Sequence, residues 1–142
     1  MKKQKYLFRA KYIDSDQWVY GGGVWKFDHA CLLLGDDHNG EIIIKSVKEK
    51  TVGQFIGMKD ARGEDLFEGD ILRPEPLAAI YKQNSIIEKQ SMAFVFRGLK
   101  PFANGRVEFS IDTITNPQMK KVPDMVKIGN SVDNPELLKE LP

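Results

Sequence analysis

Apolar and polar residues alternate in short segments along most of this chain, and glycine, proline, asparagine and aspartate separate the segments. Alternation with a period of two places apolar side chains on one face of a β-strand. The pattern therefore predicts many short strands joined by turns. The predicted strands cover residues 6–13, 18–20, 24–27, 31–34, 41–47, 52–56, 71–73, 92–96, 106–114 and 125–128.

Glycine-containing clusters mark the predicted turns. The Asn39-Gly40 pair indicates a hairpin between the strands at 31–34 and 41–47. In residues 51–72, Gly63 is expected at a positive φ, and a second turn is expected at residues 68–70. The glycines at 21–23 predict a break between two strands.

Helical signals are few. Asn134 followed by Pro135 predicts the start of a helix of about two turns near the C-terminus, with Leu137 on its apolar side. Residues 77–91 are ambiguous: a short helix after Pro76 and a strand around residues 86–87 both fit the pattern. Residues 98–105 are expected to form a loop.

The composition is ordinary for a globular protein. The 142 residues suit one domain over residues 1–142, and 42% hydrophobic with 29% charged residues supports a core of normal size. The predicted fold is mainly β: a single domain of short twisted strands, SH3-like or a partly open barrel, with a short C-terminal helix. The net charge of +1 provides no global attraction to nucleic acid or membrane.

Cys31 is the one cysteine of the sequence, so no intrachain disulfide can form. This fits a reducing compartment. No apolar run approaches the roughly 20 residues that span a bilayer. We therefore expect a cytoplasmic protein without a membrane partner.

An acidic cluster provides the first candidate chemistry. Asp65, Glu68 and Asp70 are candidates for a divalent-metal site, because hard cations bind carboxylate oxygens. The competing interpretation is that these acids are turn residues around Gly69, where their side chains accept local N–H groups. The second interpretation is favoured, so no metal is predicted.

Zinc is a weaker candidate. His29, Cys31 and His38 supply three donors, whereas structural zinc uses four, usually in paired spacings that this sequence lacks. An apolar setting favours a buried, inert thiol at Cys31. The sequence also lacks a nucleophile elbow and a phosphate-binding loop. We predict no cofactor and no enzymatic activity.

Basic residues near the start suggest contact with single-stranded nucleic acid. Lys5, Arg9 and Lys11 alternate with aromatic residues, as in β-domains that bind single strands. In a strand, however, alternation separates the two sets, so the cations are expected on a face in water and the aromatics inside. The pattern equally fits a half-buried strand.

Self-association is the other binding hypothesis. Short strands leave sheet edges that pairing between subunits can cover. Trp18, Tyr20 and Trp25 are candidate interface residues, since tryptophan and tyrosine are enriched in interfaces. Packing in the core is the alternative, and the sequence leaves both open.

Three blocks of the sequence, at residues 8–21, 51–72 and 128–138, together resemble the YopX family of phage and prophage proteins. The resemblance covers most of the chain but is poor between residues 74 and 124. It implies a small, β-rich, oligomeric protein, and it implies no particular biochemical activity.

The leading hypothesis is an accessory protein of phage or prophage type that binds a host or phage protein, or itself, in the host cytoplasm. The alternative is a β-domain that binds single-stranded nucleic acid. A metal-dependent enzyme ranks third, because the acidic cluster has no neighbouring histidine or lysine base in the sequence.

Overall fold

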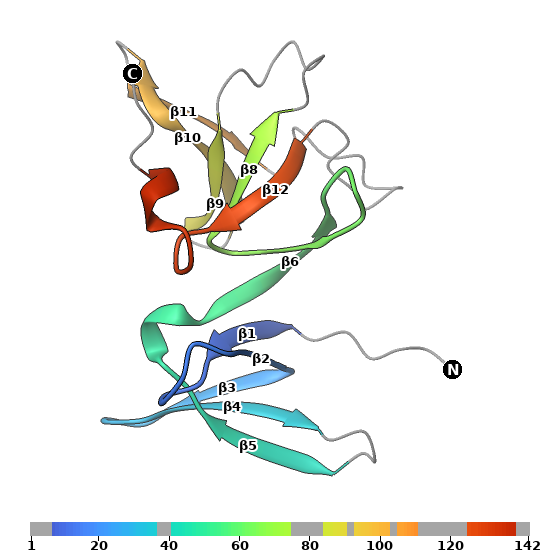
Figure 1. The fold of residues 1–142 in the computed structure, drawn as a ribbon, viewed down its shortest axis with the longest axis vertical. Coiled ribbons are helices and arrows are strands. Elements are labelled where there is room, and N and C mark those ends of the chain that lie inside the picture. Colours follow the sequence, from blue (N-terminus) through green and yellow to red (C-terminus); the bar gives the residue numbers. More distant parts are fainter. Residues whose placement is uncertain are drawn as a thin grey trace. The chain divides into compact units, whose positions relative to one another are not determined.

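The protein is built from antiparallel β-strands, as Figure 1 shows for the computed structural model. The structure describes residues 7–36, 41–74, 84–90, 93–102, 105–110 and 125–138. These residues form three sheets, and the prediction of a mainly-β fold is confirmed. Each sheet is open in the described residues, with two free ends to its strand order, so none closes into a barrel.

The chain divides into two compact units, residues 1–55 and residues 56–142. Strand β6 runs through the boundary between them. The prediction of a single domain stays a prediction, and each unit is described by itself below.

The first unit contains five strands, a one-turn 3-10 helix and the start of a sixth strand. These are β1 (Phe8–Lys11), β2 (Trp18–Gly21), β3 (Gly23–Lys26), β4 (Cys31–Asp36), β5 (Ile42–Ser46), η1 (Glu49–Thr51) and β6 (Gly53–Lys59). Strands β3, β4 and β5 form an antiparallel sheet in that order. Strand β1 pairs with β2 on one side and with the start of β6 on the other.

The second unit contains the remaining strands. These are β7 (Asp65–Phe67), β8 (Asp70–Pro74), β9 (Ser85–Gln90), β10 (Ala93–Phe102), β11 (Gly105–Ser110), β12 (Met125–Asn130) and the 3-10 turn η2 (Pro135–Leu138). Five of them form an antiparallel sheet in the order β11-β10-β9-β8-β12. Strand β7 is the neighbour of β6.

Buried apolar residues of β1, β2 and β4 form the core of the first unit, around Ala10, Val19 and Leu33. The glycine at position 21 allows β2 to approach β4 closely. A Cβ built on Gly21 would lie 2.4 Å from the carbonyl oxygen of Leu34. The glycine segment that the sequence marks as a strand break is therefore also a packing contact.

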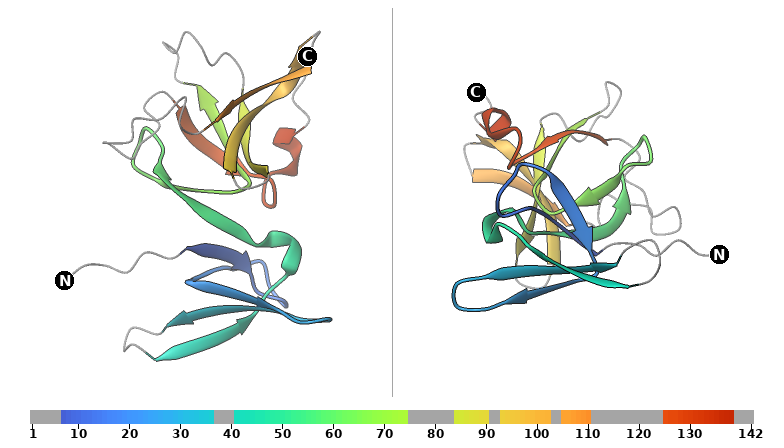
Figure 2. Two further views of the ribbon diagram at one scale, coloured as in Figure 1. Left: turned by 180° about the vertical axis from the view of Figure 1, so that it is seen from behind. Right: turned by 60° about the horizontal axis from the view of Figure 1, so that its bottom comes forward.

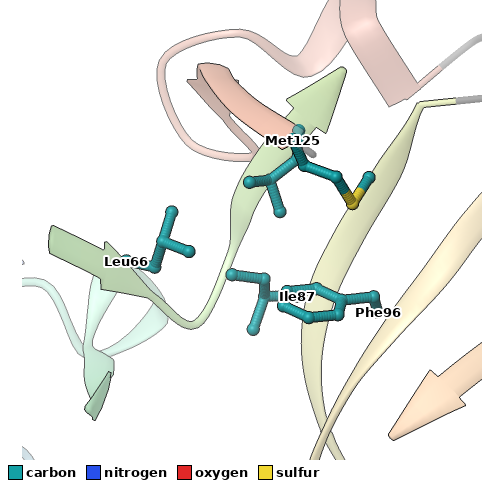
Figure 3. Close-up of a cluster of buried hydrophobic side chains, with 5 residues drawn as sticks. Leu66, Ile87, Phe96 and Met125 are labelled. Atoms are coloured by element: carbon teal, nitrogen blue, oxygen red, sulfur yellow. The ribbon is translucent and has the colours of Figure 1, made fainter. Parts of the chain in front are cut away.

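The main core of the second unit joins five strands, and β8 contributes Leu72 to it. Leu66, Ile87, Phe96 and Met125 point toward one another in Figure 3, and each is at most 1% exposed. A second cluster contains Ile71 and Ile86, against which Leu137 of η2 packs. Consecutive buried residues of β8 and β9 point to opposite faces of the sheet, so Leu72 and Ile87 belong to the first cluster and Ile71 and Ile86 to the second.

Two sequence expectations differ from the structure in the second unit. Residues 98–105 were expected to form a loop, but β10 continues to Phe102 and pairs with β11. Pro101 is tolerated because the strand register shifts between Arg97 and Pro101, and such irregularities relieve the missing N–H of proline.

The prediction of a C-terminal helix of about two turns is wrong for the residues that the structure describes. The structure has only the 3-10 turn Pro135–Leu138. The Oδ1 atom of Asn134 accepts the N–H of Asn130, four residues earlier, at 3.2 Å. The N–H of Leu137 donates to the carbonyl of Asn134, three residues earlier, as in a 3-10 helix.

Several expectations fall outside the described residues. They are the turn at Asn39-Gly40 and the short helix after Pro76. The strand expected at residues 106–114 is seen only as far as Ser110, as part of β11. The other reading of residues 77–91, a strand around residues 86–87, is confirmed by β9.

Candidate functional site

A buried carboxylate organises the turn that follows β6. Asp60 is 1% exposed, and its Oδ1 accepts the N–H groups of Arg62 and Glu64, each at 2.9 Å. Its Oδ2 accepts the N–H of Lys127 on β12, also at 2.9 Å. Gly63 has φ 88°, as predicted, and its N–H closes the turn onto the carbonyl of Asp60. Asp60 thus joins this turn to a strand that is distant in sequence.

The acidic candidates lie in structural interactions. Asp70 is 0% exposed, and its Oδ2 accepts the N–H of Phe67 at 2.7 Å. The Nζ atom of Lys127 lies 3.4 Å from the same oxygen. The Oδ1 atom of Asp65 pairs with Nζ of Lys59 at 2.7 Å. Glu68 occupies the turn beside Gly69, whose φ is 93°.

This arrangement favours turn roles for the acids. The ammonium group of Lys59 lies against the Asp65 carboxylate, and that of Lys127 lies against the Asp70 carboxylate. Each carboxylate therefore faces a cation of the protein rather than a gap lined by oxygen atoms. In the part of the chain that the structure describes, no group of three or more His, Cys, Asp or Glu side chains is arranged to hold a metal ion.

The zinc candidates are only partly placed. His29 and Cys31 both line an open hollow of about 410 Å³ beside the hairpin of β3 and β4, whereas His38 lies outside the described residues. Cys31 is 6% exposed, and burial raises the pKa of its thiol. A buried thiol with a raised pKa is a poor nucleophile and a poor metal ligand.

The basic candidates on β1 are buried, contrary to the expectation that they face water. Arg9 is 5% exposed and Lys11 is 7% exposed. The guanidinium carbon of Arg9 lies 4.7 Å from the ring centroid of Trp18, and Nζ of Lys11 lies 5.2 Å from it. The two cations share one face, as alternation requires, but cation–π contacts with Trp18 cover them. Lys5 lies outside the described residues.

The three candidate interface residues lie on two different sheets. Trp18 and Tyr20 belong to β2, and Trp25 belongs to β3. Trp18 is half-buried beneath Arg9 and Lys11, and Tyr20 is 39% exposed. Trp25 is 57% exposed, so of the three it is the one most available to a partner.

Trp25 belongs to an apolar face of the sheet β3-β4-β5. Residues directly opposite each other on neighbouring strands share a face. The register pairs Trp25 with Leu32 and Leu32 with Ser46, and it pairs Leu34 with Ile44. Ile42 shares this side of β5 by alternation. We call this surface the outer face; it consists of Trp25, Leu32, Leu34, Ile42, Ile44 and Ser46.

The opposite face of the same sheet is part of the core. Cys31, Leu33 and Val47 are at most 6% exposed there. The outer face, in contrast, leaves Ile42 79% exposed and Ile44 62% exposed. Phe27, which follows β3, is 54% exposed, and its ring stacks on Trp25 with centroids 5.3 Å apart.

The size of this patch is informative. An aromatic side chain covers 150–250 Å², so Trp25, Phe27, Ile42 and Ile44 together present roughly 400 Å² of apolar surface. Patches of about this size on monomeric proteins are often functional. On the opposite face of the sheet, Lys26 pairs with Glu49 at 2.5 Å, and the hydrogen bond to Glu49 and its charge raise the pKa of Lys26.

The sequence interpretation missed Phe27, Ile42 and Ile44. The available signal was the run Ile42-Ile43-Ile44, because three consecutive isoleucines in one strand make both of its faces apolar. It also missed Lys127, whose backbone and side chain contact four acidic residues between the end of β6 and the start of β8: Asp60, Glu64, Asp65 and Asp70. No local pattern connects residues so far apart in sequence.

These features define a class: an antiparallel, mainly-β protein with turn-forming acids and an exposed apolar sheet face. The sequence profile described as "YopX protein" matches residues 7–139. The chain therefore belongs to the YopX family, as the sequence resemblance implied.

The fold is similar to that of a solved protein. The crystal structure of protein EF1440 from Enterococcus faecalis superposes with a TM-score of 0.52 at 21% sequence identity. The match covers 96% of this chain and 99% of that chain. At this identity the similarity concerns the fold alone. A search of curated proteins found no match.

In the described residues, no helix has the length and apolar character required to cross a membrane.

Proposed function

We propose that this protein is a non-enzymatic accessory protein of phage or prophage type, which acts in the host cytoplasm by binding protein through the outer face. Membership of the YopX family supports the phage-type role. The observation that carries the binding role is the gathering of Trp25, Ile42 and Ile44 on one exposed sheet face.

The chemistry of the outer face favours a protein partner. Exposed aromatic and branched side chains are the groups that dominate binding energy in protein interfaces. By strand alternation, Lys26 and Lys45 belong to the opposite face of the sheet. The described residues of the outer face therefore include no cation, and an apolar protein surface is its natural complement.

The test is affinity capture from host cells with the wild-type chain and with Trp25→Ala as baits. Leu7→Ala is the matched control, because Leu7 is 48% exposed and lies outside the sheet β3-β4-β5. We expect proteins that the wild type and Leu7→Ala retain, that survive nuclease treatment, and that Trp25→Ala loses. Equal capture by all three baits would refute the role of the outer face.

Single-stranded nucleic acid is the second candidate ligand. The stacked, exposed rings of Trp25 and Phe27 support it, because bases stack on such aromatic platforms. The burial of Arg9 and Lys11 against Trp18 weighs against it, since a strand-binding groove needs accessible cations. Fluorescence anisotropy of a labelled oligonucleotide at low salt tests this candidate: a salt-sensitive rise is its expected sign, and a flat titration removes it.

A further inference from the structure

Strand β5 lies at the rim of its sheet, beyond β4 and away from β3, in both Figure 1 and Figure 2. The N–H of Val47 donates to the carbonyl of Cys31 at 3.0 Å. Alternate residues of an antiparallel strand direct their backbone groups to the same side. Ile43 and Lys45 therefore direct theirs toward β4, whereas Ile42 and Ile44 direct theirs away from it.

The end of this edge near Ser46 is already covered. The carbonyl of Ser46 accepts the N–H of Ile13 at 3.0 Å, and Tyr12 forms an isolated bridge with Val47. No described strand lies beyond β5 at Ile42 and Ile44. An apolar edge of this kind, without proline or an outward charge, is a template for a further strand.

The sequence of the edge complements itself. It reads Glu41-Ile42-Ile43-Ile44-Lys45. When two copies run antiparallel about a two-fold axis at Ile43, Glu41 of each copy lies opposite Lys45 of the other. Ile42 of each copy then lies opposite Ile44 of the other. Opposite charges directly across a strand pair are favourable.

The same register satisfies the backbone. Ile42 and Ile44 are the residues whose N–H and C=O groups point outward, and residues of a hydrogen-bonded pair exchange both bonds. The two symmetry-related pairs therefore form about four hydrogen bonds. In the register two residues further along, Ser46 would have to pair, although Ile13 already occupies its carbonyl. Glu41 would also face Val47 in that register.

We propose that the β5 edge binds a second copy of this chain, antiparallel and centred on Ile43, to form one continuous sheet of two β3-β4-β5 halves. This inference rests on the proposed protein-binding function and deepens it by naming the partner of the edge. The pairing also continues the outer face across both copies, because Ile42 and Ile44 belong to that face.

Sedimentation velocity over a range of concentrations tests the proposal. An edge pairing of a few residues buries less than a standard interface, so a dimer with a micromolar dissociation constant is expected. Ile44→Lys places charges at the centre of the edge and is expected to weaken the dimer more than tenfold. Its side chain is exposed, so the monomer should remain folded by circular dichroism.

Charge reversal tests the register. Glu41→Lys alone and Lys45→Glu alone each place like charges opposite one another, and each is expected to weaken self-association roughly tenfold. An equimolar mixture of the two variants restores opposite charges and should recover dimers of near wild-type affinity. Lys89→Glu, an exposed residue on β9, is the control and should leave the dimer unchanged.

The outcomes separate this inference from the proposed function. A wild-type protein that stays monomeric at 100-fold above the expected micromolar range (on the order of 100 µM) overturns the pairing, whatever affinity capture shows. A dimer whose dissociation constant is unchanged by both charge reversals and by Ile44→Lys also overturns the pairing, because another surface must then join the copies. Loss of association in the single variants with recovery in the mixture supports it.

Discussion

Replacing Asp60 with alanine should destabilise the second unit more than replacing any exposed acid. The Asp60 carboxylate is 1% exposed and accepts three backbone N–H groups, from Arg62, Glu64 and Lys127, each at 2.9 Å. Asp60→Ala removes every one of these acceptors. It also releases the turn after β6 from β12.

The expected loss follows from the donors left behind. A buried donor without its partner costs about 1–3 kcal/mol. Arg62 and Glu64 are exposed, so water can reach their amides and each counts for about 1 kcal/mol. Lys127 lies within β12 and is half-buried, so its amide counts for about 2 kcal/mol. The sum, about 4 kcal/mol, is a large share of the 5–15 kcal/mol typical of a folded domain.

Urea unfolding followed by far-ultraviolet circular dichroism is the suitable assay. Both tryptophans, Trp18 and Trp25, belong to residues 1–55, so their fluorescence reports on the first unit instead. With a slope of about 2 kcal/mol per molar urea, Asp60→Ala should lower the unfolding midpoint of the second unit by about 2 M.

Asp65→Ala is the matched control, because it removes the same charge from the same part of the chain. The Asp65 side chain is 45% exposed and pairs with the partly exposed Lys59, and such ion pairs contribute less than about 1 kcal/mol. Its midpoint should therefore shift by less than about 0.5 M. If Asp60→Ala and Asp65→Ala shift the midpoint equally, the assignment of stability to the three amide hydrogen bonds is refuted.

Three further outcomes follow from buried contacts. Gly21→Ala should lower the free energy of unfolding by about 2 kcal/mol, because the added Cβ would lie 2.4 Å from the Leu34 carbonyl oxygen. Gly22→Ala is the control: nothing lies within 4 Å of its added Cβ, so its stability, measured by unfolding followed by tryptophan fluorescence, should match that of the wild type. The raised pKa of Cys31 makes its contribution to stability fully present below the ordinary thiol pKa and lower as pH rises through the raised value; urea midpoints measured across this pH range check this, and a midpoint that does not fall with pH contradicts it. Asp70→Ala should cost about 3 kcal/mol in urea unfolding, whereas a wild-type calorimetric heat with Mg²⁺, Mn²⁺ or Ca²⁺ that the substitution abolishes would contradict a structural role.

Turn chemistry was the part of the structure most readily predicted from sequence. Gly63 has the predicted positive φ, at 88°, and the turn predicted at residues 68–70 is present, with Gly69 at φ 93°. Such turns are determined by a few adjacent residues, so a short window of sequence contains the necessary information. The strands around them follow from alternation for the same reason.

Contacts between distant residues escaped prediction. The bond from Lys127 to Asp60 spans 67 residues. No local sequence pattern around either residue predicts this hydrogen bond, because a lysine in a strand and an aspartate in a turn are both expected to face solvent. The same limit explains Arg9 and Lys11, whose alternation was correct but whose burial against Trp18 depends on the pairing of β1 with β2.

The isoleucines of β5 show how a local pattern can indicate an interface when tertiary structure is added. Ile43 contributes to the inner side of the sheet, so its apolar character needs no partner beyond this chain. Ile42 and Ile44 have the same character but are 79% and 62% exposed. A strand that is apolar on both faces is typical of strands buried on both faces. Within the described residues only one face of β5 is covered, so the second face and the open edge are where a partner of this chain is to be sought.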